Sequence, residues 1–499
     1  MKPNDIQTIS PIRIDRSNQA PVRAKRDYVL YWMIANRRRR WNFSLQRAVD
    51  WAEHLQKPLV IFEPLRVDYR WASRRMHRFA LEGMRDNAAA FRRTRALYYP
   101  YVEPQKKDSA GLMAALAAQS CVIITDDFPC FFLPRMVQAV ASQVDVAVES
   151  VDSNGLLPLR AADRTFTVAH SFRRFLQNHL RDYLLDFPEE DALSAAKIPQ
   201  AAVSLVADVQ ATYPPPSKSL LQCEAAAIAE LPIDADVDQA AFEGGSRAAE
   251  TALNTFLSNR LNRYAEERNS PEADVASGLS PYLHFGHIST HDVFAQLTEQ
   301  ESWNVSMLER RATGSRDGWW NMSPAAESFL DELITWREMG YNMCARENDY
   351  DRYESLPDWA RETIDEHRSD RRPYLYELSE LEQAKTHDLL WNASQTQLVV
   401  EGRMHNYLRM LWGKKIYEWS PSPEAALEAM IRLNNRYAVD GRDPNSYSGI
   451  FWCLGRYDRA WGPQRKIFGK IRYMSSENTA KKVPVKRYIA TYSPDRFLR

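Results

Sequence analysis

The stretch Ser277-Gly-Leu-Ser-Pro-Tyr-Leu-His-Phe-Gly286 is the most informative short segment of this 499-residue chain. A loop of serine and glycine runs directly into a helical pattern, and Pro281 suits the first turn of a helix because its nitrogen has no hydrogen to leave unpaired. Hydroxyl groups and free backbone N–H groups at such a junction can hold a pyrophosphate. Most such loops only cap a helix, so the segment by itself is a weak indication of a phosphate ligand.

Helical periodicity dominates the chain on the C-terminal side of this segment. Apolar residues recur every three to four positions, strand patterns nearly disappear, and loops rich in Gly, Asp, Pro and Ser intervene. The stretches expected to be helical are 248–263, 328–342, 383–399, 404–419 and 423–437. We therefore expect residues 246–499 to form an all-helical domain.

The chain before residue 189 predicts a different architecture. Apolar, β-branched or aromatic runs at 28–34, 59–62, 121–125 and 144–148 alternate with longer amphipathic segments. This alternation is typical of a parallel, Rossmann-like sheet covered by helices. Asp126 and Asp127 follow the third run, where open α/β sheets place their ligands. We expect an α/β domain over residues 26–188, preceded by an extension over residues 1–25.

Residues 189–245 are expected to connect the two domains. The segment is rich in alanine and acidic residues, and it contains Tyr213-Pro-Pro-Pro-Ser217, which cannot continue a helix. The five cysteines are scattered and never spaced as C-x-x-C, which argues against a disulfide framework and a cysteine-rich zinc site.

Composition indicates a soluble protein with a large core. Apolar residues make up 44% and charged residues 26% of the chain. No apolar run is long enough to cross a bilayer, and the first 25 residues lack the apolar centre of a signal peptide. We expect a monomer in the cytoplasm, associated with the nucleoid if the source is bacterial, and no membrane partner.

Basic residues are unevenly distributed, although Lys plus Arg and Asp plus Glu both number 65. Only Glu477 is acidic in the stretch 465–487, and two aromatic residues are interleaved, which suits a phosphate-binding face. Its basic residues are Arg465, Lys466, Lys470, Arg472, Lys481, Lys482, Lys486 and Arg487. The run alone leaves open an ordinary solvated surface. A second basic run at 36–41 is expected to be a solvated loop or, less favoured, an auxiliary phosphate contact.

Longer strings of sequence extend the argument to a family. The segment at 277–286 resembles the flavin-phosphate motif of the photolyase and cryptochrome superfamily. Further strings, in family order, are similar to class II cyclobutane pyrimidine dimer photolyases, at 256–261, 330–338, 386–393, 402–412, 433–437, 440–445 and 468–474. Two shorter strings fit in the first half, at 28–33 and 167–172.

The resemblance implies the photolyase/cryptochrome fold with FAD bound among the C-terminal helices. Arg409 and Asp440 match a salt-bridged pair beside the isoalloxazine ring, and Asn434 matches an amide that faces flavin N5. Without the resemblance, Asn434 would be interpreted as a surface or capping amide. The full set of implied FAD contacts is Tyr264, Ser277, Gly278, Leu279, Ser280, Arg409, Asn434, Asp440, Asp443 and Asn445.

The implied reaction is electron transfer from excited, reduced FAD to a pyrimidine dimer flipped out of DNA. Glu338 matches the carboxyl group that hydrogen-bonds the dimer, and a dry cavity would favour its neutral form. The alternative for Glu338 is a surface pair with Arg337 or another cation. Met410, Trp452 and Trp461 are expected to contact the lesion, with core packing as the competing role.

Three tryptophans match the electron-transfer chain of class II enzymes, namely Trp391, Trp412 and Trp419. Trp412 and Trp419 are seven residues apart, which places them on one face of a helix about 10 Å apart. Aromatic residues at this spacing more often belong to a core. Two histidine pairs, at 284/287 and 387/405, lack the carboxylate-rich spacing of a metal site, and none is expected.

Two segments depart from the family pattern. The string at 453–461 is one residue shorter than the usual glycine-containing loop, and the Arg/Trp-rich composition of 303–320 is unfamiliar. The N-terminal domain of the family can house an antenna pigment, a deazaflavin or a folate, and the sequence does not decide between them.

The sequence favours light-driven repair of cyclobutane dimers in DNA over two alternatives. The first alternative is a cryptochrome-like photoreceptor without repair activity, which we expect to carry a long C-terminal tail, whereas 25 residues follow Met474 here. The second is a helical nucleotide-binding protein without photochemistry. The class II likeness also argues against activity on 6-4 photoproducts.

Overall fold

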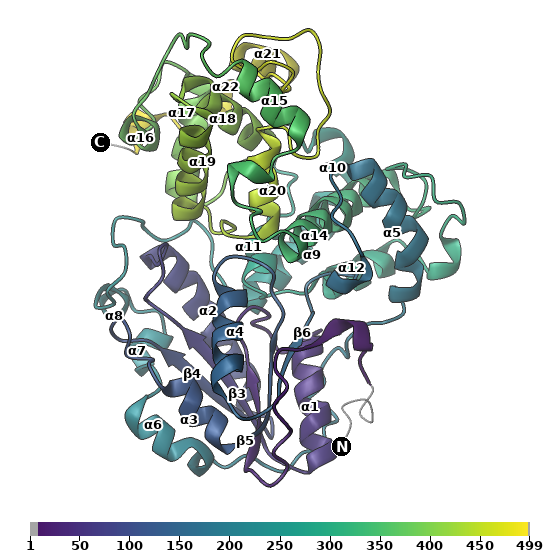
Figure 1. Cartoon of the computed structure of the whole chain (residues 1–499), viewed down its shortest axis with the longest axis vertical. Helices are drawn as coiled ribbons and strands as arrows, with labels where there is room; N and C mark the ends of the chain where they lie inside the picture. Colours follow the sequence, from purple (N-terminus) through teal and green to yellow (C-terminus); the bar gives the residue numbers. More distant parts are fainter. Residues whose placement is uncertain (1–7, 498–499) are drawn as a thin grey trace.

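The computed structural model describes residues 8–497 and has an α/β part at one end and helices at the other (Figure 1). The sheet has six strands in the order β1-β6-β5-β2-β3-β4. Only the β1–β6 pair is antiparallel. The strands are β1 (Ile14–Arg16), β2 (Tyr28–Trp32), β3 (Leu59–Leu65), β4 (Leu97–Val102), β5 (Ser120–Asp126) and β6 (Val148–Val151).

The central strands are buried along their whole length, as expected for parallel strands covered on both faces. Four helices provide the cover, α1 (Phe43–Leu55), α2 (Arg74–Phe91), α3 (Leu112–Gln119) and α4 (Leu133–Gln143). The α/β prediction is confirmed, with strands at the first three expected runs and the fourth shifted to Val148–Val151.

Two edge strands were not predicted. β4 contains Pro100, which lacks the N–H that a central strand needs, and it lies at the edge of the sheet as this requires. β1 comes from the expected N-terminal extension and pairs with β6 at the opposite edge. Neither short run carries enough alternation to be recognised from the sequence alone.

The segment expected to connect the domains is packed against the α/β part. It forms α6 (Ala207–Thr212), α7 (Lys218–Leu221) and α8 (Ala225–Ala229), which lie beside α2 and α3 (Figure 1). Leu220 and Ile228 join a small apolar cluster with Leu81 of α2. The connection is therefore part of the folded body.

Residues 246–497 are helical, as predicted, and form two groups (Figure 1). The helix at Ala169–Tyr183, which the predicted boundary at residue 188 assigns to the α/β domain, packs with the first of these groups. The first group holds α5 (Ala169–Tyr183), α9 (Ser246–Asn259), α10 (Leu261–Glu267), α11 (Ser280–His284), α12 (Thr290–Gln300), α13 (Pro324–Leu330), the π-helix η6 (Asp331–Trp336) and α14 (Arg337–Arg346). The second holds α15 (Asp358–Glu366), α16 (Leu378–Glu382), α17 (Leu389–Glu401), α18 (Asn406–Trp419), α19 (Pro423–Tyr437), α20 (Pro444–Trp452), α21 (Ser476–Lys482) and α22 (Lys486–Thr491).

A buried arginine joins the α/β part to the second helical group. Arg75 of α2 donates to the carbonyls of Leu398, Val399 and Tyr437 at 3.3, 2.6 and 2.8 Å. These carbonyls lie in the last turns of α17 and α19, where intrahelical partners run out and partial negative charge accumulates. One guanidinium therefore caps both helices.

Arg38 in the basic run at 36–41 is structural, so the prediction of a solvated loop or phosphate contact was wrong for this residue, whereas Arg40 is exposed. Arg38 is buried and donates to the carbonyls of Gly286 and Ser153, each at 3.2 Å. Gly286 has φ +70°, and a Cβ there would lie 1.9 Å from the carbonyl oxygen of Ala35. The end of the 277–286 motif is therefore in direct contact with the loop after β2, and it has no room for a side chain.

No helix within residues 8–497 combines the length and the apolar character needed to cross a membrane.

Candidate functional site

The serine loop at 277–280 lies against the loop that joins α19 to α20. Ser280 donates its hydroxyl to the carboxylate of Asp440, and the Arg409 guanidinium from α18 contacts the same carboxylate at 3.2 Å. Burial opposes ionisation of Asp440, but Arg409 and Ser280 outweigh it, so the pKa of Asp440 lies below its usual value. The structure thus brings together three residues predicted from separate motifs.

Asp443 forms a second polar centre beside this one. Its carboxylate accepts the N–H of Asn445 at 2.9 Å and caps α20. It also contacts His284 Nδ1 at 3.2 Å and the Tyr341 hydroxyl at 3.3 Å. Burial lowers the pKa of His284 despite the nearby carboxylate. Asp443 and Asn445 therefore organise the wall of the site, with His284 held neutral at pH 7.

The serine loop borders open space that suits a ligand. Gly278 has φ +70°, and a Cβ built there would meet no atom within 4 Å. Ser280 is exposed, and Ser277 and Gly278 are half-buried, whereas Leu279 points into the core. A glycine in the left-handed region with empty space beside it lets a ligand approach the backbone closely. The hydroxyls, the open space and the Arg409–Asp440 pair fit the phosphates and ring of FAD.

Asn434 lies on α19 and faces α20. It is buried, and its side-chain nitrogen donates to the Ser446 hydroxyl at 2.6 Å and to Asn435 Oδ1 at 3.3 Å. Asn434 is therefore not the surface amide that we would expect from the sequence without the family resemblance. With Nδ2 directed at these two oxygens, its Oδ1 is the atom that could face a ligand.

The three predicted tryptophans lie close together. Trp391 Nε1 donates to the backbone carbonyl of Trp412 at 3.0 Å, and the rings of Trp391 and Trp419 are 5.6 Å apart at 70°. All three are buried. The spatial order is therefore Trp412, Trp391, Trp419, because Trp391 of α17 lies between two residues of α18.

Aromatic residues that were not identified from the sequence lie between Trp419 and the solvent. Tyr376 and His387 lie 5.4 and 5.2 Å from the Trp419 ring. Tyr374 stacks on His387 at 3.8 Å and is 48% exposed. The Tyr376 hydroxyl and His387 Nδ1 are 2.6 Å apart, so a proton could move between them. Trp419 itself does not reach the surface.

Glu338 is not placed to contact a lesion. Its carboxylate accepts the backbone N–H groups of Leu156 and Leu157 at 2.7 and 3.1 Å. A Cβ on Gly155 would lie 2.5 Å from Glu338 Oε1, so no space remains between them. Burial raises the pKa of Glu338 to about 7, although Arg337 and the two amides oppose the shift. Glu338 therefore joins α14 to the α/β part, which differs from both roles predicted for it.

Glu332, six residues earlier in the same matched string, is half-buried and has different surroundings. It lies one turn of the π-helix before Trp336. The Trp336 ring stacks on the Trp452 ring, with the ring centroids 4.7 Å apart and an angle of 16° between the ring planes. Glu338 projects about 200° away from Trp336, since successive helical residues turn by about 100°. Glu332 pairs with Arg268, and burial raises its pKa against the effect of that guanidinium.

Glu332, Trp336, Met410 and Trp452 are half-buried, and we name this group the lesion mouth after the role that we propose for it below. The Met410 carbonyl oxygen accepts a hydrogen bond from the Cys453 thiol, with 3.8 Å between oxygen and sulfur, which places Met410 beside the end of α20. Predicted residues Met410 and Trp452 are thus brought together. Tyr264 lies on the Arg268 side of the mouth and packs on Phe329 at 5.8 Å. Within residues 8–497, the ring and cation contacts of Tyr264 involve neither Ser280 nor Asp440.

Trp461 lies on the basic surface of the second helical group. Its ring is flanked by the guanidinium groups of Arg459 and Arg472 at 4.8 and 5.1 Å, and its Nε1 donates to Asp458 at 2.9 Å. All eight basic side chains predicted between Arg465 and Arg487 are exposed. The surface therefore combines cations with an aromatic face, as nucleic-acid-binding surfaces do.

A cavity of about 990 Å³ lies between the α/β part and the helices, at the carboxyl ends of β3 and β5. Asp127 and Arg160 pair at 2.5 Å in its wall. Asp126 instead accepts three backbone N–H groups of residues 34–36. Aromatic and arginine side chains also line the cavity, among them Tyr69, Trp71, Arg70 and Arg346. Of the two aspartates expected beyond β5, only Asp127 faces a cavity.

Comparisons with known proteins agree on one family. The chain is 32% identical over 463 residues to a deoxyribodipyrimidine photo-lyase of Methanothermobacter thermautotrophicus, covering 93% of this chain and 94% of that protein. It is 32% identical to the Arabidopsis thaliana protein of the same name, covering 93% and 88%. The Potorous tridactylus protein of that name is 31% identical, covering 93% and 81%. The chain belongs to the deoxyribodipyrimidine photo-lyase family.

The photolyase fold is supported by a solved structure. A bacterial class III photolyase from Agrobacterium tumefaciens superposes with a TM-score of 0.67 at 14% identity, covering 94% of this chain and 87% of that one. No family model matched the sequence. Among residues 8–497, no group of three or more His, Cys, Asp or Glu side chains is arranged to hold a metal ion.

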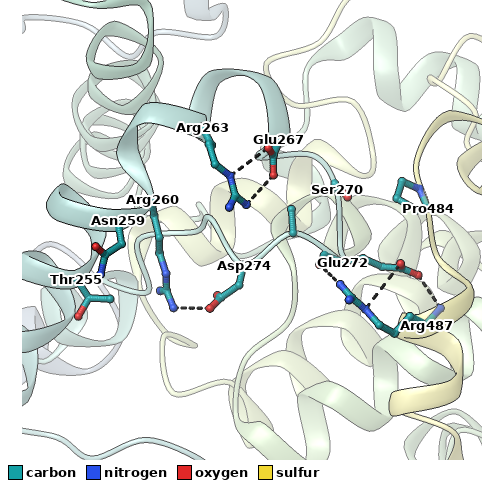
Figure 2. Close-up of a pocket in the computed structure, with 11 residues that line it drawn as sticks. Thr255, Asn259, Arg260, Arg263, Glu267, Ser270, Glu272, Asp274, Pro484 and Arg487 are labelled. Atoms are coloured by element: carbon teal, nitrogen blue, oxygen red, sulfur yellow. Dashed lines mark hydrogen bonds and ion pairs between the residues drawn. The ribbon is translucent and has the colours of Figure 1, made fainter.

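A polar pocket of about 710 Å³ separates α9 and α10 of this photolyase from α22 (Figure 2). Each of its three arginines already pairs with a carboxylate, Arg260 with Asp274, Arg263 with Glu267 and Arg487 with Glu272. Glu272 also accepts the N–H groups of Arg487 and Tyr488 at 2.6 and 3.2 Å. It therefore caps α22 and joins this C-terminal helix to the loop that leads into Ser277.

Replacing Glu338 in this photolyase with alanine is expected to destabilise the fold. The amides of Leu156 and Leu157 would lose their acceptor, which costs about 2–4 kcal/mol of unfolding free energy for two buried donors. Urea unfolding monitored by circular dichroism measures the change. Glu332→Ala, the matched control, should cost less than about 1 kcal/mol because its ion pair is partly exposed. Equal losses in the two variants would contradict the assigned geometry.

Replacing Glu272 with alanine should lower the unfolding free energy by about 1 kcal/mol, the typical effect of a lost helix cap. The matched control is Glu267→Ala. Glu267 and Arg263 are one helical turn apart, and their exposed ion pair contributes about 0.5 kcal/mol or less. Thermal or urea unfolding of the two variants separates a cap from a surface pair. The interpretation fails if Glu267→Ala is the more destabilising of the two.

Proposed function

We propose that this chain is a class II photolyase that repairs cyclobutane pyrimidine dimers in DNA by light-driven electron transfer. One juxtaposition carries the proposal. Met410 of the lesion mouth directly follows Arg409 on α18, so the mouth, with its stacked Trp336–Trp452 pair and the Glu332 carboxyl, shares a helix with Arg409 of the Arg409–Asp440 pair and with Trp412. A flat, partly exposed aromatic surface beside a carboxyl suits a flipped pair of bases.

FAD, when bound, supplies the electron on excitation by blue light. Ser277 and Ser280 would bind its phosphates, with the open side of Gly278 admitting them close to the backbone. The Arg409–Asp440 pair would flank the ring, and Asn434 would present its carbonyl to the ring edge. Burial of Trp391, Trp412 and Trp419 keeps water from the path between ring and surface.

The lesion mouth would position the dimer and stabilise its added charge. Partial burial raises the pKa of Glu332 above its usual value, and the neutral carboxyl can donate a hydrogen bond to a dimer carbonyl. Arg268, paired with Glu332, adds a positive charge where negative charge develops. Trp336, Trp452 and Met410 supply the apolar and polarizable surface on which the bases rest.

DNA is the partner that the exposed charges support. The basic run from Arg465 to Arg487 and the stacked Trp461 lie on one helical group, next to the loop that follows the lesion mouth. Exposed cations of this kind bind phosphates in a salt-dependent, sequence-independent way. The relatives' name, deoxyribodipyrimidine photo-lyase, agrees with a substrate made of DNA pyrimidines.

An antenna pigment of the deazaflavin or folate type would occupy the cavity between the α/β part and the helices. Its volume of about 990 Å³ is within the range of small-molecule sites, and its arginines and aromatic rings suit a flat, anionic chromophore. The absorption spectrum of pigment released from native-source protein distinguishes the two classes.

Repair itself is tested with an oligonucleotide that contains one thymine dimer. Reduced, flavin-loaded protein should convert it under blue light and not in the dark, and the absence of conversion by the loaded wild type would reject the proposed function. Glu332→Gln should lower the repair yield at saturating substrate roughly tenfold or more, because an amide N–H is a weaker hydrogen-bond donor to the charged dimer than a protonated carboxyl. Glu338→Gln, the control, should keep the yield per folded, loaded molecule.

Photoreduction of the flavin should depend on Trp391, the middle tryptophan. Trp391→Phe keeps a buried aromatic ring but is much harder to oxidise, so light-driven reduction should slow by about tenfold or more while repair by chemically reduced protein persists. Trp32→Phe, a buried tryptophan of the sheet, serves as control. Unchanged photoreduction in Trp391→Phe would show that electrons follow another route.

A further inference from the structure

The Arg/Trp-rich segment between α12 and α13 forms a loop on a fixed base. We call residues 308–318 the arginine loop. At its base, Trp303 Nε1 donates to the carbonyl of Trp320 at 2.6 Å, and the N–H of Glu309 donates to the carbonyl of Trp319 at 2.9 Å. Trp319 and Trp320 are buried. The tryptophans of this segment are therefore core residues that close the base of the loop.

The tip of the arginine loop is fixed by α5. The N–H of Gly314 donates to Gln177 Oε1 at 2.7 Å, and Gln177 Nε2 returns a hydrogen bond to the carbonyl of Ser315 at 2.8 Å. Arg173 donates to the carbonyl of Gly314 at 3.2 Å. Three bonds to the backbone hold the tip in one conformation, so side chains on it project from a defined position.

The same arginine places the loop beside the lesion mouth. Arg173 pairs with Asp331 at 2.8 Å, and Asp331 directly precedes Glu332 in the π-helix. The positive charge of Arg316 is also close enough to favour ionisation of Glu332. The loop therefore borders the mouth on the side of the first helical group, whereas the basic run 465–487 belongs to the second group (Figure 1).

Three arginines of the loop are available to a ligand. Arg310 and Arg311 are exposed, and within residues 8–497 neither guanidinium has a recorded hydrogen bond or ion pair. Arg316 pairs only with its neighbour Asp317, and both side chains are more than half exposed, so the pair contributes little. Glu309 turns back onto its own loop and accepts the N–H groups of residues 310 and 311 at 2.7 and 3.1 Å.

We propose that the arginine loop binds backbone phosphates of the DNA strand that flanks the flipped dimer. This inference rests on the proposed function, because DNA must be brought to the lesion mouth. Guanidinium groups bind phosphates in a bidentate geometry, and a fixed backbone reduces the entropy lost on binding. With cations on both helical groups, the duplex is held on both sides of the mouth.

The test compares two variants with the same loss of three charges. The first is Arg310→Gln/Arg311→Gln/Arg316→Gln, and the control is Lys25→Gln/Lys106→Gln/Lys197→Gln, three exposed lysines of the α/β part and its connection. Affinity for a 20-base-pair duplex, with and without one thymine dimer, is measured at several salt concentrations. Repair of the dimer under blue light is measured at saturating duplex.

The loop variant should bind both duplexes about tenfold or more weakly, and the slope of log affinity against log salt should fall by about two to three, close to one per lost contact. The control should match the wild type, and repair at saturation should be unchanged in both variants. Equal affinities and slopes for loop variant and control would overturn the proposal. A wild type that binds duplex but repairs nothing in light would instead overturn the proposed function and leave the loop contact standing.

Discussion

The arrangement of the helices depends on a buried guanidinium at the domain boundary. Arg75 satisfies carbonyls at the ends of both α17 and α19, which carry Trp391 and Asn434. Helix ends buried without partners would cost several kcal/mol. Because α18 packs between these two helices, fixing their ends also fixes Arg409 and Trp412. The α/β part, through α2, thereby sets the geometry of a site to which it contributes no predicted residue.

A second contact at the same boundary explains why two acidic residues of one helical segment differ in role. Glu338 meets the amides of residues 156 and 157, whereas Glu332 faces the lesion mouth with Arg268. The π-helix between them widens the turn and sets the direction of Trp336. One carboxyl therefore positions the segment, and the other is partly exposed where the proposed function places the substrate.

Much of the architecture could be predicted from local pattern. The buried strands and the change to helical periodicity follow from patterns that are local in sequence, whereas the grouping of the serine loop with residues 440–445 was implied by the family resemblance. The choice between Glu332 and Glu338 could not be made in this way, because both lie in one matched string and only the opposing wall distinguishes them. The i to i+4 spacing of Glu332 and Trp336 was the available signal. The role of Arg38 was also misjudged, since one of its partners, Gly286, comes from a distant part of the chain.

The most direct test of this account is a crystal structure of the reduced protein with a dimer-containing oligonucleotide. The account predicts the dimer against Trp336 and Trp452, with a carboxyl oxygen of Glu332 within about 3 Å of a base carbonyl. It also predicts that Glu338 keeps its two backbone amides. A dimer bound away from the Trp336–Trp452 pair, or hydrogen-bonded to Glu338, would contradict it.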